Sequence, residues 1–254
     1  MKSLVRKIFN SDISIIVRNS LNFKSIIMNR NLQGYSSVSD AFAWRTDNSY
    51  TTKFKYSDIL GLYDIEKDTN VKLEFYSKEN KLLKSLEVFD LNYSNELLID
   101  KKFMNGIEDY GVFYIYHFSK KNLNENVISN RCYLGYSFKN NLFSFVHGNC
   151  YARYYNSPNN KFGTDIIKTS LFKNHYYKIQ KYFEDYDLLE LFFANPTSKT
   201  IKFSLGKLKY TIKSGCSIIV NLSNKNSIII KSNCMFLRPT IFQYKNNYLD
   251  VHHS

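Results

Sequence analysis

The chain has 254 residues and a formal net charge of +13, with 44% hydrophobic residues, 17% aromatic residues, nine glycines and three prolines. This composition can bury a substantial core, which excludes disordered, collagen-like and linker-dominated architectures. The 35 Lys and Arg residues against 22 Asp and Glu point to polyanionic partners, because clustered cations attract nucleic acids and acidic polysaccharides. In the sequence, however, the lysines are dispersed.

Residues 1–34 form a distinct basic segment, with six Lys or Arg residues against the single acidic residue Asp12. Apolar residues recur at loosely helical spacing from Leu4 to Leu21. The pattern predicts a partly helical segment that either contacts a membrane surface peripherally or packs as an arm on the rest of the protein. Asp12 and Arg18 interrupt the apolar stretch, so it lacks a signal-peptide core, and no stretch has the length of a transmembrane helix. We therefore expect a cytoplasmic protein with reduced cysteines.

From Tyr35 onward, short runs of branched and aromatic residues alternate with turn sequences, which is typical of antiparallel β-structure. Residues 164–187 are the one later stretch with a helical pattern, although the residues from His175 onward fit a strand equally well. Asparagine is abundant, and it tolerates the positive φ angles that turns require. The predicted strands are Val71–Tyr76, Val112–His117, Leu189–Phe193, Ile201–Leu205, Ser217–Leu222 and Ser227–Lys231.

The two halves of the chain share five short matches in the same order. These pair Leu73–Tyr76 with Leu189–Phe192, Gly111 with Gly215, Cys132 with Cys234, Lys139–Asn141 with Lys245–Asn247, and Val146–His147 with Val251–His252. Each match is weak alone, but their collinear order indicates an internal duplication. The sequence therefore predicts a mainly β fold of two tandem antiparallel β-sandwich-like domains, residues 40–150 and 165–254, after the basic segment 1–34.

If the halves correspond, His147 and His252 occupy the same place at the end of the last strand of each copy. Histidine is both a metal ligand and an acid–base group, so these two residues are the candidate catalytic pair of an enzyme. Adding Cys150 and His253 gives a candidate metal site, provided that the strand ends meet. The alternative is that these histidines cap strands or contact a neighbouring domain. The sequence contains no HExxH motif, paired-cysteine zinc spacing, nucleophile signature or phosphate loop, so we expect no cofactor.

Four further residues are candidate ligand-binding positions. Trp44 and Arg45 stand together among polar residues, where an exposed indole stacks on a sugar ring and a guanidinium pairs with an anion. The alternative for this pair is a core tryptophan beside a structural Arg–Asp pair. Asn149 lies close to His147, and Arg238 requires a carboxylate partner such as Asp250 if it is buried.

These patterns favour a non-enzymatic binding or scaffolding protein that recognises an acidic or surface polysaccharide. One alternative is an enzyme with a site between the two repeats, centred on His147 and His252, that acts on a sugar or a similar polar substrate. A second alternative is a nucleic-acid-binding protein, although the chain carries none of the usual motifs of that class.

Overall fold

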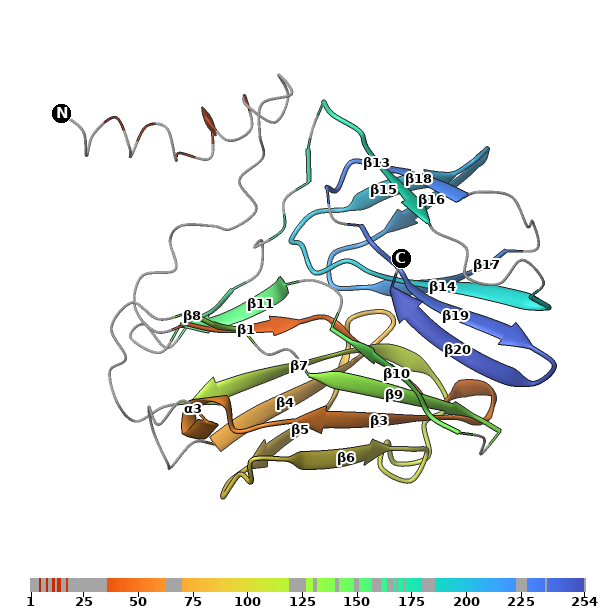
Figure 1. Ribbon diagram of the computed structural model, residues 1–254. Coiled ribbons are helices and arrows are strands. Elements are labelled where there is room, and N and C mark those ends of the chain that lie inside the picture. Colours follow the sequence, from red (N-terminus) through yellow and green to blue (C-terminus); the bar gives the residue numbers. More distant parts are fainter. Residues whose placement is uncertain are drawn as a thin grey trace.

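Figure 1 shows the computed structural model of the chain. Apart from six isolated residues before position 18, the predicted basic segment 1–34 lies outside the described residues. The structure describes residues 36–62, 70–118, 127–129, 132–139, 142–148, 151–156, 161–163, 167, 169–170, 172–179, 186–222, 228–235 and 237–253.

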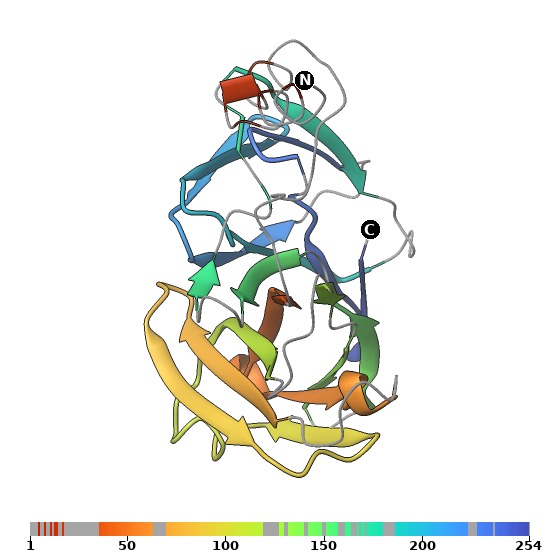
Figure 2. The same cartoon turned by 90° about the vertical axis from the view of Figure 1, so that its left-hand side faces the viewer.

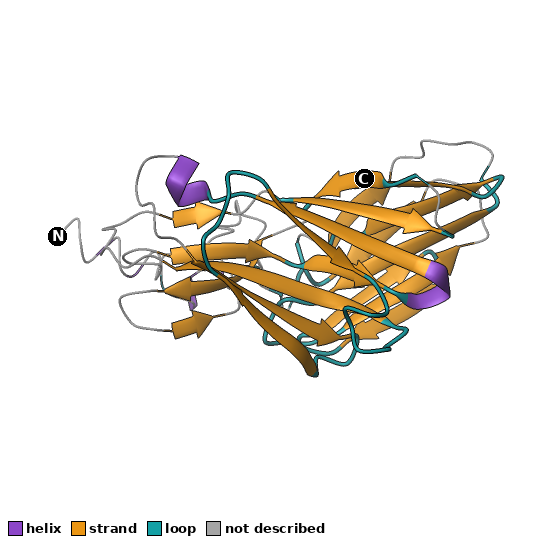
Figure 3. Ribbon diagram, turned by 90° about the horizontal axis from the view of Figure 1, so that it is seen from below, coloured by secondary structure: helices purple, strands orange, loops and turns teal. Residues whose placement is uncertain are grey.

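The described part of the chain is mainly β, and strands dominate the view in Figure 3. Its two short helical turns between strands are η1 (Asp47–Ser49) and α3 (Ile59–Leu62). The strands of the N-terminal part are β1 (Ser36–Asp40), β2 (Phe42–Arg45), β3 (Tyr50–Tyr56), β4 (Asn70–Ser77), β5 (Leu82–Val88), β6 (Asn95–Ile99), β7 (Tyr110–Phe118), β8 (Val127–Ser129), β9 (Tyr133–Phe138), β10 (Ser144–His147), β11 (Tyr151–Asn156) and β12 (Lys161–Gly163). The strands of the C-terminal part are β13 (His175–Ile179), β14 (Leu188–Ala194), β15 (Ile201–Leu205), β16 (Leu208–Ile212), β17 (Ser217–Leu222), β18 (Ile228–Ser232), β19 (Thr240–Lys245) and β20 (Tyr248–His253).

All six predicted strands are confirmed, as β4, β7, β14, β15, β17 and β18. Within 164–187 the strand alternative is correct, because β13 begins at His175. Period-two burial explains the success: β4 reads as alternating half-buried and buried residues, which is the signature of a strand with one face in the core. Asparagine also takes positive φ at Asn80, Asn105 and Asn246, as the composition predicts.

The strands form five four-stranded sheets with the orders β12-β11-β1-β8, β10-β9-β3-β6, β2-β7-β4-β5, β13-β18-β15-β16 and β17-β14-β19-β20. The pairings are antiparallel except for β1 with β8, which is parallel. In Figure 2 the C-terminal sheets, drawn in blue, lie above the orange and green N-terminal sheets. The sheet that contains β1 was not predicted, since β1 itself is mainly polar and β8 and β12 have only three residues each.

Two pairs of sheets have the same connectivity. When β2–β7, β9 and β10 are matched in order to β13–β20, the sheet β2-β7-β4-β5 corresponds to β13-β18-β15-β16, and β10-β9-β3-β6 corresponds to β20-β19-β14-β17. Three sequence matches fall at equivalent places under this scheme. Val146–His147 lies in β10 and Val251–His252 in β20, Lys139 and Lys245 lie where the chain turns from β9 to β10 and from β19 to β20, and Cys132 and Cys234 precede β9 and β19. The other two do not, because Leu73 lies in the third strand of its set and Leu189 in the second, while Gly111 lies in β7 and Gly215 in the turn between β16 and β17.

The cores are not divided as two separate sandwich domains require. One apolar cluster lies between β2-β7-β4-β5 and β10-β9-β3-β6, where the ring of Phe113 lies 4.8 Å from that of Phe54 and 5.0 Å from that of Phe75. This cluster also contains Phe192 and Phe242 of the C-terminal half. The side chains next to Phe192 in β14 belong to a second cluster instead. The sheet β17-β14-β19-β20 thus contributes one face to each core, because successive strand residues point to opposite faces.

Candidate functional site

Trp44 lies in the core, with none of its surface exposed to solvent. Its indole Nε1 donates a hydrogen bond of 2.9 Å to the carbonyl oxygen of Tyr76. Gly111 makes room for this contact, since a Cβ atom there would lie 2.9 Å from Trp44 Nε1. The ring therefore presents no face to a ligand in solution, and the structure favours the alternative interpretation of a core tryptophan.

Arg45 is also buried, with 1% of its surface exposed, and it joins the two halves of the chain. Its Nε and Nη2 donate to the two carboxylate oxygens of Asp47 at 3.0 and 2.7 Å, which is the expected local Arg–Asp pair. Its Nη1 donates at 2.5 Å to Glu190 Oε2, 145 residues away in β14. The guanidinium also lies 3.9 Å from the centroid of the Tyr50 ring. Burial opposes the charged form, but the hydrogen bond to Asp47 and the neighbouring negative charge raise the pKa of Arg45 above its ordinary value.

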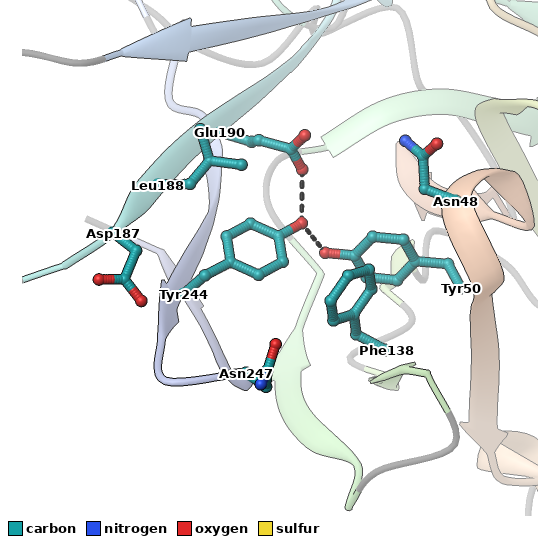
Figure 4. A pocket seen from close by; sticks show the side chains of 8 residues that line it. All are labelled: Asn48, Tyr50, Phe138, Asp187, Leu188, Glu190, Tyr244 and Asn247. Atoms are coloured by element: carbon teal, nitrogen blue, oxygen red, sulfur yellow. Dashed lines mark hydrogen bonds between the residues drawn. The ribbon is translucent and has the colours of Figure 1, made fainter.

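Two tyrosines continue this network into a pocket (Figure 4). The hydroxyls of Tyr50 and Tyr244 form a hydrogen bond, and Tyr244 also donates at 2.6 Å to Glu190 Oε2. Burial raises the pKa of both phenols, so they remain protonated at neutral pH. The pocket has a volume of about 290 Å³ and is lined by Asn48, Tyr50, Phe138, Asp187, Leu188, Glu190, Tyr244 and Asn247.

The structure brings His147 next to His253 rather than next to His252. The rings of His147 and His253 are 4.9 Å apart, and His253 Nε2 is hydrogen-bonded to the carbonyl oxygen of His147. His252 points elsewhere, with its Nε2 at 3.2 Å from Gln243 Oε1. Burial lowers the pKa of His253 to about 4, so this side chain is neutral at pH 7. The end of β10 thus does meet the end of β20, but through a different pair of histidines than the one expected.

Of the other predicted positions near these histidines, the structure describes Arg238. Arg238 is half-buried and lies near His253, whose pKa its charge helps to lower. Asn149 and Cys150 lie outside the described residues. Among the residues that the structure describes, no group of three or more His, Cys, Asp or Glu side chains is arranged to hold a metal ion.

The sheet β13-β18-β15-β16 has a basic surface. One face of this sheet is apolar and belongs to the second core cluster, with Phe203 and Ile230 near its centre. The opposite face is solvent-exposed, and none of its four strands contains an aspartate or a glutamate. Within the described residues, no carboxylate pairs with the lysines on this face. These residues, which we call the lysine face, are Lys178, Lys202, Lys209 and Lys231.

Strand register sets the spacing of these charges. One row of directly paired residues crosses the four strands and consists of Tyr176, Lys231, Ser204 and Lys209. Adjacent strands are about 4.8 Å apart, so Lys231 and Lys209, which lie on either side of Ser204, are about 10 Å apart. Lys231 Nζ also lies 5.8 Å from the centroid of the exposed Tyr176 ring. In each of these four strands, inward-facing and outward-facing residues alternate, and the sequence places one lysine at an outward-facing position. This pattern identifies the face only when the pairing of the strands is known.

No protein-family model, curated protein or solved structure matches this chain. In the part of the chain that the structure describes, no helix has the length and apolar character needed to cross a membrane.

Proposed function

We propose that the protein is a non-enzymatic binding protein whose lysine face recognises an acidic polysaccharide. The observation that carries this proposal is the gathering of four exposed lysines, without a neighbouring acidic residue in their strands, on one face of one sheet. Elsewhere on the surface, lysines such as Lys53, Lys72 and Lys78 form ion pairs with Glu96, Glu74 and Asp109. Uncompensated charge of one sign produces an attractive field for a polymer of the opposite sign.

The chemistry of the face favours a polysaccharide over a nucleic acid. Its cations are all lysines, which act as point charges and lack the forked geometry with which arginine recognises phosphate. Its one exposed aromatic side chain is Tyr176, whereas proteins that bind single-stranded nucleic acid stack successive bases on several rings. A single ring beside a row of charges suits a sugar ring flanked by carboxylate or sulfate groups.

The test compares two variants that remove the same amount of charge. The face variant replaces Lys178, Lys202, Lys209 and Lys231 by Gln, and the control variant replaces the ion-paired Lys53, Lys72, Lys78 and Lys101 by Gln. We expect binding to polygalacturonate to weaken at least ten-fold in the face variant, because each lost contact removes part of the counterion-release free energy. The control variant should bind within about three-fold of the wild type, since its lysines are already neutralised.

A second candidate function, binding of single-stranded nucleic acid, is favoured by another surface. The outer face of β10-β9-β3-β6 exposes Tyr133 and Phe145, and Lys55 Nζ lies 5.1 Å from the centroid of the Phe145 ring. Both Lys53 and Lys55 pair with Glu96, which reduces their attraction for phosphate. This candidate predicts that the protein binds oligothymidylate more tightly than polygalacturonate. It also predicts that a Tyr133→Ser, Phe145→Ser variant loses this binding, which would assign the function to the outer face of β10-β9-β3-β6.

We also propose that the two pairs of sheets descend from a duplicated β-sandwich-like unit. The identical connectivity of β2–β10, without β8, and β13–β20 supports this proposal. So do the sequence matches at Cys132, Lys139 and His147, which fall at equivalent strands or connections. The boundaries 40–150 and 165–254 remain part of the proposal.

A further inference from the structure

The pocket between the two halves has a buried floor and an exposed rim. Tyr50, Tyr244 and Glu190 form the floor, each less than 10% exposed. The exposed rim consists of Asn48, Asp187, Leu188 and Asn247. Phe138 forms a wall of the pocket. Figure 4 shows the two phenol hydroxyls of the floor meeting below the Glu190 carboxylate, with Asn48 and Asp187 of the rim on opposite sides.

Glu190 has hydrogen-bonding capacity that the described residues do not use. Its hydrogen bonds from Arg45 and Tyr244 both go to Oε2. Within the described part of the chain, Oε1 accepts none. A carboxylate oxygen accepts up to two hydrogen bonds, and Oε1 is not one of the fully buried atoms that lack a partner, so water or a ligand in the pocket can reach it.

The local charge is negative although the protein as a whole is strongly positive. Arg45 is shared by Asp47 and Glu190, so this buried triad carries one net negative charge. Asp187 at the rim adds a second, and none of the lining residues is cationic. Lys139 lies nearby, with Nζ 5.0 Å from the centroid of the Phe138 ring, but does not line the pocket.

We propose that this pocket binds a small organic cation, with a primary ammonium group bonded to Glu190 Oε1 and an aliphatic stem lying along the wall that Phe138 and Tyr244 form together. The rings of these two aromatic residues lie 5.3 Å apart in an edge-to-face arrangement, which provides an apolar wall with electron-rich surfaces. The volume of about 290 Å³ lies at the lower end of ligand sites, which restricts the ligand to a small molecule. This inference is independent of the lysine face, which attracts charge of the opposite sign.

The test is isothermal titration calorimetry of the full chain with butylammonium chloride, with 1-butanol as the neutral ligand of the same length. We expect saturable binding of butylammonium with a dissociation constant of about 1 mM or tighter, and none of 1-butanol in the same range. Glu190→Gln keeps the size of the side chain and one acceptor oxygen but removes its charge, and it should weaken binding roughly ten-fold.

Asp187→Asn serves as a second variant because its exposed rim position leaves the core network intact, and it should weaken binding by about two- to three-fold. Glu108→Gln, on a remote surface ion pair, is the matched control and should bind like the wild type. Absence of saturable heat up to on the order of 10 mM butylammonium overturns the proposal. Equal binding of 1-butanol, or unchanged affinity in both folded pocket variants, overturns it as well.

Discussion

Replacing Arg45 by Met tests whether the buried ion triad holds the two halves together. The change removes three charge-assisted hydrogen bonds, at 3.0 and 2.7 Å to Asp47 and at 2.5 Å to Glu190, and the contact with the Tyr50 ring. It also leaves Glu190, with a side chain only 10% exposed, as a buried charge without its cation. Breaking such a pair from one side costs about 3 to 5 kcal/mol. That is a large part of the roughly 5 to 15 kcal/mol by which a protein is stable.

The assay is urea denaturation followed by tryptophan fluorescence, since Trp44 is the single tryptophan and lies next to Arg45. A double-mutant cycle with Glu190→Gln isolates the contribution of the pair. Glu190→Gln should reduce the free energy of unfolding by about 1 to 3 kcal/mol less in the Arg45→Met background than in the wild type, because there it removes a buried charge that has lost its cation. Lys101→Met, which breaks an exposed ion pair, should leave the unfolding midpoint almost unchanged. A loss of less than 1 kcal/mol in Arg45→Met, or additive effects in the cycle, would refute the argument that the triad couples the halves.

Two further stability predictions follow from close contacts and from burial. Gly111→Ala should destabilise the fold by about 3 kcal/mol or more in the same urea assay, because a Cβ atom would lie 2.0 Å from the Tyr76 carbonyl oxygen and strand β4 would have to move. Gly135→Ala meets only the ring of the partly exposed Phe145, which can rotate away, so a cost equal to that of Gly111→Ala would contradict this reasoning. Because burial lowers the pKa of His253 from 6.5 to about 4, the unfolded chain binds a proton in this window that the folded one does not. Stability should therefore fall by up to about 3 kcal/mol as pH drops from 6.5 to 4. His253→Asn should flatten this dependence in denaturation curves, and an equally steep dependence in the variant would contradict the assignment.

The secondary structure could be predicted from the sequence where alternation was strong. Strands such as Val71–Tyr76 and Ile201–Leu205 place branched and aromatic residues at every second position, and this period depends only on local geometry. The short polar strand β1 lacks that signal. Its place is fixed instead by pairing with β11, more than 100 residues away, which no local pattern reveals.

The candidate sites were harder to predict because they depend on long-range register. Trp44 is followed by the polar residues Arg45, Thr46 and Asp47 and yet lies in the core, since Gly111 on the neighbouring strand leaves space for the indole. The partner of Arg45, Glu190, is 145 residues away, and no spacing rule connects them. The lysines of the lysine face are dispersed in the sequence, and only the pairing of β13, β18, β15 and β16 collects them on one surface.

The most direct test of the lysine face is the salt dependence of polygalacturonate binding. The logarithm of the binding constant is plotted against the logarithm of salt concentration for the wild type and for the variant with Lys178, Lys202, Lys209 and Lys231 replaced by Gln. If each of these four lysines displaces about one counterion, the slope should become shallower by about three in the variant. An unchanged slope, with affinity equal to that of the wild type, would contradict the proposal that this face holds the polymer.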